Sequence, residues 1–486
     1  MSGRFLAFDL GAESGRAMIG QLDGGVLTLD EVWRFPNEPV QTNGSLHWDI
    51  SRLWREMTRG FDRVSALPLD SIGIDTWGCD YALIGRHGGL LENPYHYRDW
   101  RTDGMMEAVF TRVSPERIYS ITGVQFININ TLYQLYAACR KTPTTVEAAE
   151  WFCMIPDLLN YWLTGHLNAE FTIATTTQFV DARTRAWATD LLSDLCIPAR
   201  LLPPLVEPGT IVGQVRGDVS KEVAGTPVVA PACHDTGSAV AAVDAGGPTA
   251  FISSGTWSLL GTELVAPLVT PKARDLNFTN EGGVCGTTRL LKNITGMWLL
   301  QRCRHSWATS GHDHAYHDLF TEAADAPAFQ TLVDPDYRGF FQPADMVAAI
   351  GEYCRQTEQP MPASPAACTR AVLESLAFKY RAVLESLEDL TGTRFEEIRI
   401  VGGGSRNRLL NQFTADATGR TVVAGPIEAT ALGNIGMQML ATGTVSSLAE
   451  ARQVIDRSFP VERFEPSDCD PWNTHYRRFQ QYQAFS

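Results

Sequence analysis

The stretch FDLGAESGR, Phe8 to Arg16, places an acidic residue at the end of an apolar run and two glycines in the turn that follows. Apolar runs at 5–8, 17–19 and 26–33, separated by glycine-containing turns, predict a three-stranded antiparallel meander around it. Glycines allow backbone N–H groups to approach phosphate oxygens, and a carboxylate such as that of Asp9 can hold Mg²⁺. Because Asp and Gly are also common in ordinary hairpin turns, this stretch indicates phosphate binding only in combination with other motifs.

The sequence beyond the meander predicts the rest of an α/β unit. Asp49 is a candidate helix N-cap, and apolar residues follow at helical spacing over 53–64. A short strand is expected at Ser71 to Asp75. Three strands, a helix and a fourth strand form the start of a ribonuclease-H-like unit.

The second half of the chain repeats this pattern. Strands expected at 249–253 and 257–260 flank a tight turn, as in the first meander. A long helix with an apolar stripe from Leu373 to Leu390 is closed by Gly392, and a strand (398–401), a helix (409–418) and a strand (421–424) follow. We therefore expect a distant duplication, with domains of residues 1–244 and 245–486, a cleft between them and the boundary at Asp244-Ala245-Gly246-Gly247-Pro248.

A second motif, PACHDTGSA at Pro231 to Ala239, follows an apolar strand at 228–230. A carboxylate at the end of a buried strand, just before a helix, is well placed at the floor of a cleft. There Asp235 can accept the proton of a sugar hydroxyl as that hydroxyl attacks a γ-phosphorus. Taken singly, the same residues have structural explanations, Asp235 as an N-cap and His234 as a core histidine.

Two further motifs lie in the second half. SSGTWS at Ser253 to Ser258 is a hydroxyl-rich turn that could grip the β- and γ-phosphates or simply be a good turn sequence. VGGGSRN at Val401 to Asn407 could lie against adenine or ribose, or be a flexible strand–helix connection. Because no Walker A sequence occurs, nor a GxGxxG with a later ribose-binding acid, P-loop and Rossmann folds are disfavoured. Together the four motifs predict an α/β protein with two ribonuclease-H-like (actin-like ATPase) domains flanking a central cleft.

The composition narrows the class of protein. The 40 basic and 55 acidic residues give a net charge of −15 at pH 7, and no Lys/Arg stripe occurs, so we expect no nucleic-acid partner. Neither a signal-peptide core nor 18 consecutive apolar residues is present, so we expect a cytoplasmic protein with no membrane partner. The 10 cysteines contain no CxxC pair, and Cys354 and Cys368, on either side of a Pro-containing loop, are expected to be reduced thiols rather than a disulfide.

Motifs along nearly the whole chain resemble those of the FGGY carbohydrate kinases, above all the branch that phosphorylates L-rhamnulose. The stretches that carry the resemblance are DLGAESGR (9–16), SIGIDTWGCD (71–80), YRDWRT (97–102), NTLYQL (130–135), TIATTTQ (172–178), CHDTGS (233–238), ISSGTWS (252–258), TNEGG (279–283), KNITGMWLLQR (292–302) and GPIEATALG (425–433).

The resemblance implies a reaction and the residues that perform it. The terminal phosphate of ATP, with Mg²⁺ facing Asp9, would pass to L-rhamnulose and give L-rhamnulose 1-phosphate in L-rhamnose catabolism, with Asp235 as proton acceptor. ATP would contact Ala12, Glu13, Ser14, Gly15, Arg16, Thr256, Gln301 and Gly403. The sugar would contact Gly78, His234, Asp235, Thr236 and Asn293. Many relatives have Thr or Ser where Ala12 and Glu13 stand, so Glu13 is expected to point to solvent and offer only its backbone N–H.

Three other functions stay open at the level of sequence. The chain could phosphorylate another ketose or polyol, such as fuculose, xylulose or glycerol, because one sequence does not reveal the hydroxyl contacts. An actin-like ATPase acting as a chaperone or filament subunit would hydrolyse ATP slowly without sugar and would need no buried His-Asp pair. A sugar-sensing regulator would usually add a helix-turn-helix, for which no room precedes Phe5. The sequence leaves the oligomeric state undetermined.

Overall fold

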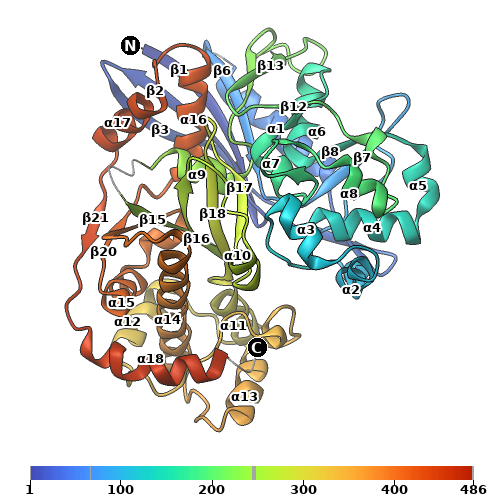
Figure 1. The fold of residues 1–486 in the computed structure, drawn as a ribbon. Coiled ribbons are helices and arrows are strands. Elements are labelled where there is room, and N and C mark those ends of the chain that lie inside the picture. Colours follow the sequence, from blue (N-terminus) through green and yellow to red (C-terminus); the bar gives the residue numbers. More distant parts are fainter. Residues whose placement is uncertain (1, 66, 244–247, 484–486) are drawn as a thin grey trace. The chain divides into compact units, whose positions relative to one another are not determined.

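The computed structural model describes residues 2–65, 67–243 and 248–483, so that most of the expected domain boundary, 244–247, lies outside the described residues (Figure 1). The chain forms two compact units. The first comprises Met1–Asp244, Glu263–Leu290 and Ala429–Phe459, and the second comprises Ala245–Thr262, Leu291–Glu428 and Pro460–Ser486. Two segments of the second half of the sequence therefore belong to the first unit.

The sheet of the first unit confirms the predicted meander. Strands β1 (Ser2–Leu10), β2 (Ser14–Asp23) and β3 (Val26–Pro36) pair antiparallel, and β6 (Ser71–Thr76) lies parallel to β1. Strand β14 (Pro227–Ala230) is parallel to β6, and β13 (Thr210–Gln214) completes the order β13-β14-β6-β1-β2-β3. Because β1, β6 and β14 run in the same direction, the residues at their carboxyl ends meet at one edge of the sheet.

Helices of this unit begin where the sequence supplies caps. Helix α1 (Ile50–Val64) starts after Asp49, whose Oδ1 accepts a hydrogen bond from the N–H of Arg52, as predicted. Beyond β6 follow β7 (Tyr81–Gly85), α2 (Met105–Phe110), α3 (Pro115–Thr122), α4 (Thr131–Lys141), α5 (Pro143–Ala148), β8 (Ala149–Met154), α6 (Ile155–Thr164), α7 (Phe171–Thr175), α8 (Thr189–Asp194) and, after β14, α9 (Asp235–Ala241).

Helix α16 (Ala429–Ala441) explains why a late segment of the chain belongs to the first unit. It packs on β1, β6 and α9, as Figure 1 shows near the label β1. At Gly433 a Cβ atom would lie 1.7 Å from the carbonyl oxygen of Ser238, so only glycine allows this approach to α9. On the sheet side, Gln438 Oε1 accepts a hydrogen bond from Ser71 Oγ at 2.7 Å, and both groups are buried.

The sheet of the second unit confirms the predicted repeat of the pattern. Strands β15 (Thr249–Ser254) and β16 (Trp257–Leu264) form an antiparallel hairpin, and β19 (Glu397–Val401) and β20 (Thr421–Ala424) extend the sheet in parallel from β15. With β17 (Thr279–Gly282), β18 (Thr288–Thr295) and β21 (Glu462–Phe464), the order is β17-β18-β16-β15-β19-β20-β21. Strands β16 and β18 cross the border between the units.

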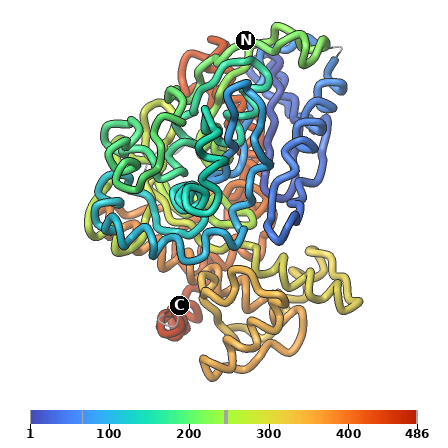
Figure 2. The backbone as a smooth tube through the Cα atoms, turned by 90° about the vertical axis from the view of Figure 1, so that its right-hand side faces the viewer, coloured from blue at the N-terminus to red at the C-terminus, as the bar shows by residue number. Residues whose placement is uncertain are grey.

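The helices of the second unit include the long predicted one. Helix α14 (Pro365–Thr391) ends at Gly392, whose φ of 66° is the left-handed conformation expected of a C′ glycine. It packs against α11 (Trp298–Thr309), α12 (Tyr316–Asp325), α15 (Arg408–Thr418) and α18 (Asp470–Gln483), and α13 (Met346–Gln356) packs against α11. In Figure 2, α11 to α13 belong to the yellow and orange part of the tube.

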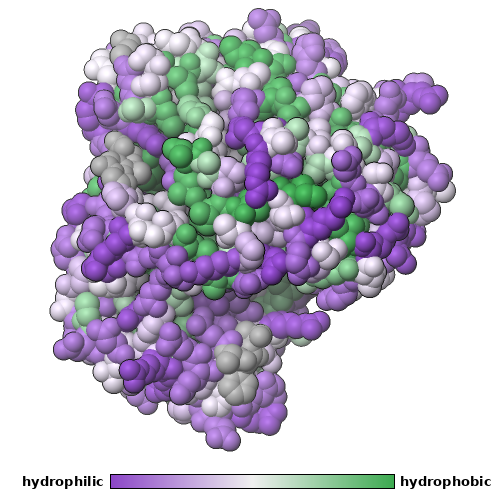
Figure 3. Space-filling model, viewed as in Figure 1, coloured by the Kyte–Doolittle hydropathy of each residue, from purple (hydrophilic) through white to green (hydrophobic). Residues whose placement is uncertain are grey.

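On the face shown in Figure 3, the surface is a mixture of hydrophilic and hydrophobic residues. Within the described residues, none of the helices combines the length and the apolar character that crossing a bilayer takes.

Candidate active site

Three aspartates occupy the carboxyl edge of the first unit's sheet. Asp9 lies at the end of β1, Asp75 is its register partner on β6, and Asp235 opens helix α9 after β14. Burial raises the pKa of Asp75 well above its ordinary value, and the negative charges of Asp9 and Asp235 raise it further. The edge is therefore a place where negative charge accumulates and where a cation or a proton is favoured.

The side chain of Asp235 is partly accessible to solvent, unlike that of the neighbouring His234. Its side chain is 32% exposed, whereas that of His234 is 9% exposed. The Oδ1 atom of Asp235 accepts hydrogen bonds from the backbone N–H (2.5 Å) and the hydroxyl (3.2 Å) of Thr236. His234 is the N-cap residue and Asp235 the first residue of the helix, so the structural role of N-cap falls to His234. The carboxylate of Asp235 is thus held in place with part of its surface open to a ligand.

A buried glutamate holds the backbone that leads into Asp235. Glu170 accepts hydrogen bonds from the N–H groups of Thr172 (2.8 Å) and Cys233 (3.0 Å), and the hydroxyl of Thr172 accepts one from the N–H of His234 (3.2 Å). Burial raises the pKa of Glu170 to about 7. These bonds fix the position of the loop that carries the predicted base.

The loop after β6 brings Gly78 against His234. The N–H of Cys79 donates to the Thr176 hydroxyl at 3.1 Å, and the hydroxyl of Thr131 donates to the carbonyl of Cys79 at 2.6 Å. A Cβ atom at Gly78 would lie 3.3 Å from His234 Nε2. The structure therefore brings Gly78, His234, Asp235 and Thr236, four of the five predicted sugar contacts, together in the first unit.

We expect Gly78→Ala to weaken sugar binding without unfolding the protein. The added methyl group would press on Thr176 and His234, at 3.2 and 3.3 Å, and overpacking of this kind costs about 1–3 kcal/mol of strain. Because His234 is a proposed sugar contact, we expect this strain to appear in sugar binding, where it corresponds to roughly 5- to 150-fold in KM. Steady-state kinetics over a range of sugar concentrations measures the change. Gly89→Ala is the matched control, since a Cβ there meets nothing within 4 Å, and an equal rise in KM for both variants would contradict the assignment.

Asp80 anchors the same loop through four donors. Its Oδ2 accepts hydrogen bonds from Trp48 Nε1 (2.6 Å), Trp77 Nε1 (3.0 Å) and the N–H of Tyr97 (3.2 Å), and its Oδ1 accepts one from Gln134 Nε2 (2.9 Å). Burial raises the pKa of Asp80 to about 6. All four partners are donors, so position 80 requires a side chain that accepts hydrogen bonds at both of its terminal atoms, as a carboxylate does.

We therefore expect Asp80→Asn to destabilise the first unit. The amide would turn an NH₂ group toward a donor, and an unsatisfied buried polar group costs about 1–3 kcal/mol. Urea denaturation followed by tryptophan fluorescence measures the free energy of unfolding. Asp62→Asn, at an exposed position of α1, is the control; equal stability of the two variants would show that the four hydrogen bonds contribute nothing.

The predicted phosphate turn lies between β1 and β2. The N–H of Gly11 donates to the carbonyl of Ser14 at 3.0 Å, and Asn37 braces the turn through its side chain (to the Gly11 carbonyl, 2.9 Å) and its N–H (to the Glu13 carbonyl, 2.9 Å). Glu13, in this turn, is exposed. At the base of the turn, Arg16 forms an ion pair with Asp9.

The second unit holds the other predicted nucleotide contacts. Gln301 Nε2, on α11, donates to the hydroxyl of Thr256, in the turn between β15 and β16, at 3.2 Å. Gly403 opens a short 3₁₀ turn after β19, preceded by Gly402 with a φ of 81°. Asn293, predicted for the sugar site, lies on β18 in this unit.

Four residues near the predicted base were not assigned a role from the sequence: Asp75, Glu170, Glu281 and Arg289. All four are buried, and they lie on or beside β6, α7, β17 (Thr279–Gly282) and β18. Three of them stand within or beside motifs that carry the family resemblance. The one available signal was a charged residue inside an otherwise apolar or small-residue stretch, which indicates a buried polar group but not its partner.

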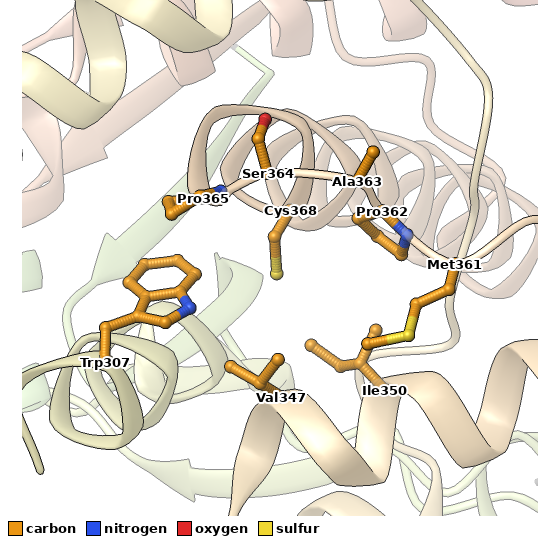
Figure 4. Close-up of a pocket in the computed structure, with 9 residues that line it drawn as sticks. All are labelled: Trp307, Val347, Ile350, Met361, Pro362, Ala363, Ser364, Pro365 and Cys368. Carbon is orange, nitrogen blue, oxygen red and sulfur yellow. The ribbon is translucent and has the colours of Figure 1, made fainter. Parts of the chain in front are cut away.

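A separate cavity of about 180 Å³ lies in the second unit between α11, α13 and α14. Figure 4 shows Trp307, Val347 and Cys368 facing a common space. None of the predicted site residues lines it. Cys354 and Cys368 are free thiols, and Cys368 faces Cys303, with 3.9 Å between the two sulfur atoms.

Comparison with known proteins covers nearly the whole chain. Residues 4–242 match the N-terminal domain, and residues 250–442 the C-terminal domain, of the FGGY family of carbohydrate kinases. The chain is 46% identical over 484 residues to a rhamnulokinase of Bacteroides thetaiotaomicron, covering 99% of each chain, and 42% identical to one of Oceanobacillus iheyensis, covering 94% of this chain and 97% of the relative.

Solved structures share the fold at low sequence identity. Gluconate kinase from Lactobacillus acidophilus superposes with a TM-score of 0.80 at 17% identity (100% of this chain, 97% of the other), and xylulose kinase from Rhodospirillum rubrum with 0.79 at 18% (99% and 98%). The predicted fold class, α/β with two actin-like ATPase domains, is confirmed.

Proposed function

Because this chain belongs to the FGGY family of carbohydrate kinases, we propose that it transfers the terminal phosphate of ATP to L-rhamnulose and releases L-rhamnulose 1-phosphate and ADP. The observation that carries the choice of sugar is the full-length identity of 40–46% to several relatives named rhamnulokinase. The first unit adds a chemical reason for proposing phosphoryl transfer to a hydroxyl. A partly exposed carboxylate, which can accept a proton, lies beside a buried histidine at the edge of its sheet.

Asp235 is the proposed base. The 1-hydroxyl oxygen of the sugar attacks the γ-phosphorus, an O–P bond forms, the bond from the γ-phosphorus to the ADP oxygen breaks, and the hydroxyl proton passes to Asp235. The contacts to Thr236 fix one carboxylate oxygen and leave the exposed part of the carboxylate for the substrate. Gly78, His234, Thr236 and Asn293 are the proposed sugar contacts.

Mg²⁺ is the proposed metal, and the residues at the sheet edge fit it. Asp75 Oδ1 is buried without a hydrogen-bond partner among the described residues, and three carboxylates share this edge. No group of three or more His, Cys, Asp or Glu side chains suited to enclosing an ion occurs in the described part of the chain. Mg²⁺ binds through one or two carboxylates together with water and phosphate oxygens, and Asp9 is the proposed ligand. Such an ion would neutralise charge on the β- and γ-phosphates.

The turn at Ala12 to Arg16 is the proposed phosphate clamp of the first unit. Its backbone N–H groups supply donors, and Asn37 holds the turn in shape. Thr256, Gln301 and Gly403 are the proposed nucleotide contacts of the second unit. ATP and a small sugar are the proposed partners, and the cytoplasm, where ATP is regenerated, is the proposed location.

A sugar panel tests the proposal. ADP release would be followed for L-rhamnulose, L-fuculose, D-xylulose and glycerol, and NMR would give the position of the phosphate. We expect the highest kcat/KM for L-rhamnulose, with phosphate on O1. A higher value for another sugar would reassign the substrate within the family, whereas ATP hydrolysis that no sugar stimulates would favour a non-kinase ATPase.

A further inference from the structure

The imidazole of His234 is enclosed by charged side chains on both of its nitrogen atoms. Nε2 lies 3.5 Å from Asp235 Oδ1, on the side of Gly78. Nδ1 lies 3.2 Å from Arg289 Nη2 and 3.2 Å from Glu281 Oε2. All four charged or titratable residues belong to the first unit.

Arg289 has a fixed position beneath this ring. Its side chain is 0% exposed, and its Nε donates a hydrogen bond to the carbonyl of Gly282 at 2.8 Å. Glu281, itself 6% exposed at the side chain, balances the guanidinium charge at 3.2 Å. Because burying a charged pair costs several kcal/mol in desolvation, an apolar pair of similar volume would serve folding at least as well. The contact between Arg289 and the ring of His234 gives a functional reason for burying the Arg289–Glu281 pair.

The hydrogen-bond chemistry of the two neighbours decides which ring nitrogen carries the proton. A guanidinium only donates, so the contact from Arg289 Nη2 requires a lone pair on Nδ1. Glu281 Oε2 lies at the same distance from Nδ1, 3.2 Å, but outside hydrogen-bond geometry among the described residues, so Arg289 Nη2 is the hydrogen-bond partner of this ring nitrogen. In the singly protonated imidazole, this contact places the proton on Nε2.

We propose that Arg289, balanced by Glu281, is a positioning residue that holds His234 in the Nε2–H tautomer, so that His234 donates a hydrogen bond to a sugar oxygen beside Asp235. The distance of 3.5 Å from Nε2 to Asp235 Oδ1 exceeds the range of a good hydrogen bond, which leaves this N–H available to a substrate. The identity of the acceptor as a sugar oxygen rests on the proposed function, whereas the tautomer does not.

A fixed donor next to the base selects for substrate chemistry. The attacking hydroxyl faces Asp235, and the next oxygen along the sugar accepts from Nε2–H. An α-hydroxy ketone supplies such an acceptor on the carbon adjacent to the attacking hydroxyl. A substrate without an oxygen at that carbon would leave the donor unpaired, which is a costly state for a buried polar group.

The tautomer can be measured without any substrate. In long-range ¹H–¹⁵N spectra of the full-length protein labelled with ¹⁵N-histidine, the His234 signals are those that disappear in His234→Gln. We expect the Nε2–H pattern in the unchanged protein and a change to the Nδ1–H pattern in Arg289→Met, because Glu281 then becomes the partner of Nδ1. Arg370→Met is the matched control, since it also removes an arginine from a buried glutamate (Glu374, 2.7 Å) but leaves His234 untouched.

Glu281→Gln provides a second test that does not depend on the folding of Arg289→Met. It leaves Arg289 in place, so the Nε2–H pattern should persist. A change of tautomer in Glu281→Gln, or the Nδ1–H pattern in the unchanged protein, would overturn the proposal.

Kinetics with L-rhamnulose adds a readout that lost stability alone would not produce. We expect Arg289→Met to raise the sugar KM roughly 10- to 100-fold, as for a lost hydrogen bond to a charged or buried group, while the KM for ATP changes less than threefold. In a His234→Gln background the same substitution should have no further effect, since Arg289 acts through the ring. Additive losses would contradict the assignment. If no sugar in the panel were phosphorylated while His234 showed the expected Nε2–H pattern, the proposed function would be refuted and the tautomer assignment would stand.

Discussion

Asp235→Asn should phosphorylate L-rhamnulose about 10²–10⁴ times more slowly than the unchanged enzyme, the loss typical of removing a general base. The asparagine carbonyl can still accept the bonds from Thr236, so the loop keeps its shape, but an amide cannot take the hydroxyl proton. The sugar KM should change little. Coupled assays of ADP release at saturating sugar and ATP measure kcat, and calorimetric titration measures sugar binding.

Asp190→Asn, at an exposed position of α8, controls for the loss of one carboxylate from the first unit. A near-normal kcat for Asp235→Asn would remove Asp235 from the mechanism. A large loss of sugar affinity with unchanged kcat would make it a binding residue only.

Asp9→Asn should lower kcat about 10²–10³-fold and raise the concentration of Mg²⁺ needed for half-maximal rate. A metal ion contributes several kcal/mol to the stabilisation of charge on the transferred phosphoryl group, and an amide is a weaker ligand than a carboxylate. Initial rates over a titration of MgCl₂, at saturating ATP and sugar, give both quantities. Chelation with EDTA should abolish turnover of the unchanged enzyme and be reversed by MgCl₂.

The ion pair between Asp9 and Arg16 requires its own control, since Asp9→Asn also breaks it. Arg16→Gln breaks the pair and keeps the carboxylate. If Arg16→Gln leaves the Mg²⁺ requirement unchanged, the effect of Asp9→Asn belongs to the metal. Equal shifts in both variants would show that the pair, rather than metal binding, explains the loss.

The local elements of this fold could be predicted because each has a local cause. The glycine turns of the first meander, the Asp49 cap of α1 and the Gly392 cap of α14 depend only on neighbouring residues. The return of α16 to the first unit depends on the fit of Gly433 against α9, almost 200 residues earlier in the chain. Hydrophobic periodicity contains no information about such a contact.

The same distinction applies to the site. Gly78, His234, Asp235 and Thr236 were predicted from motifs and from the family resemblance, and the structure brings them together. Asp75 joins Asp9 only through the parallel register of β1 and β6, and Arg289 reaches His234 only through the folding of β17 and β18. Their roles follow from geometry between distant segments. The functions of Asp9, Asp235 and the nucleotide contacts stay predictions until the variants are measured.

The place of α16 has a consequence for how the protein is made. Residues 429–459 complete the first unit, yet they leave the ribosome about 185 residues after position 244 (429 minus 244). At ~5–20 residues per second, roughly 10–40 s separate the two events. During that interval the nascent amino-terminal half exposes the face of β1 and β6 that α16 later covers, so this unit matures only near the end of translation, and a ribosome stalled before codon 429 would hold an aggregation-prone intermediate.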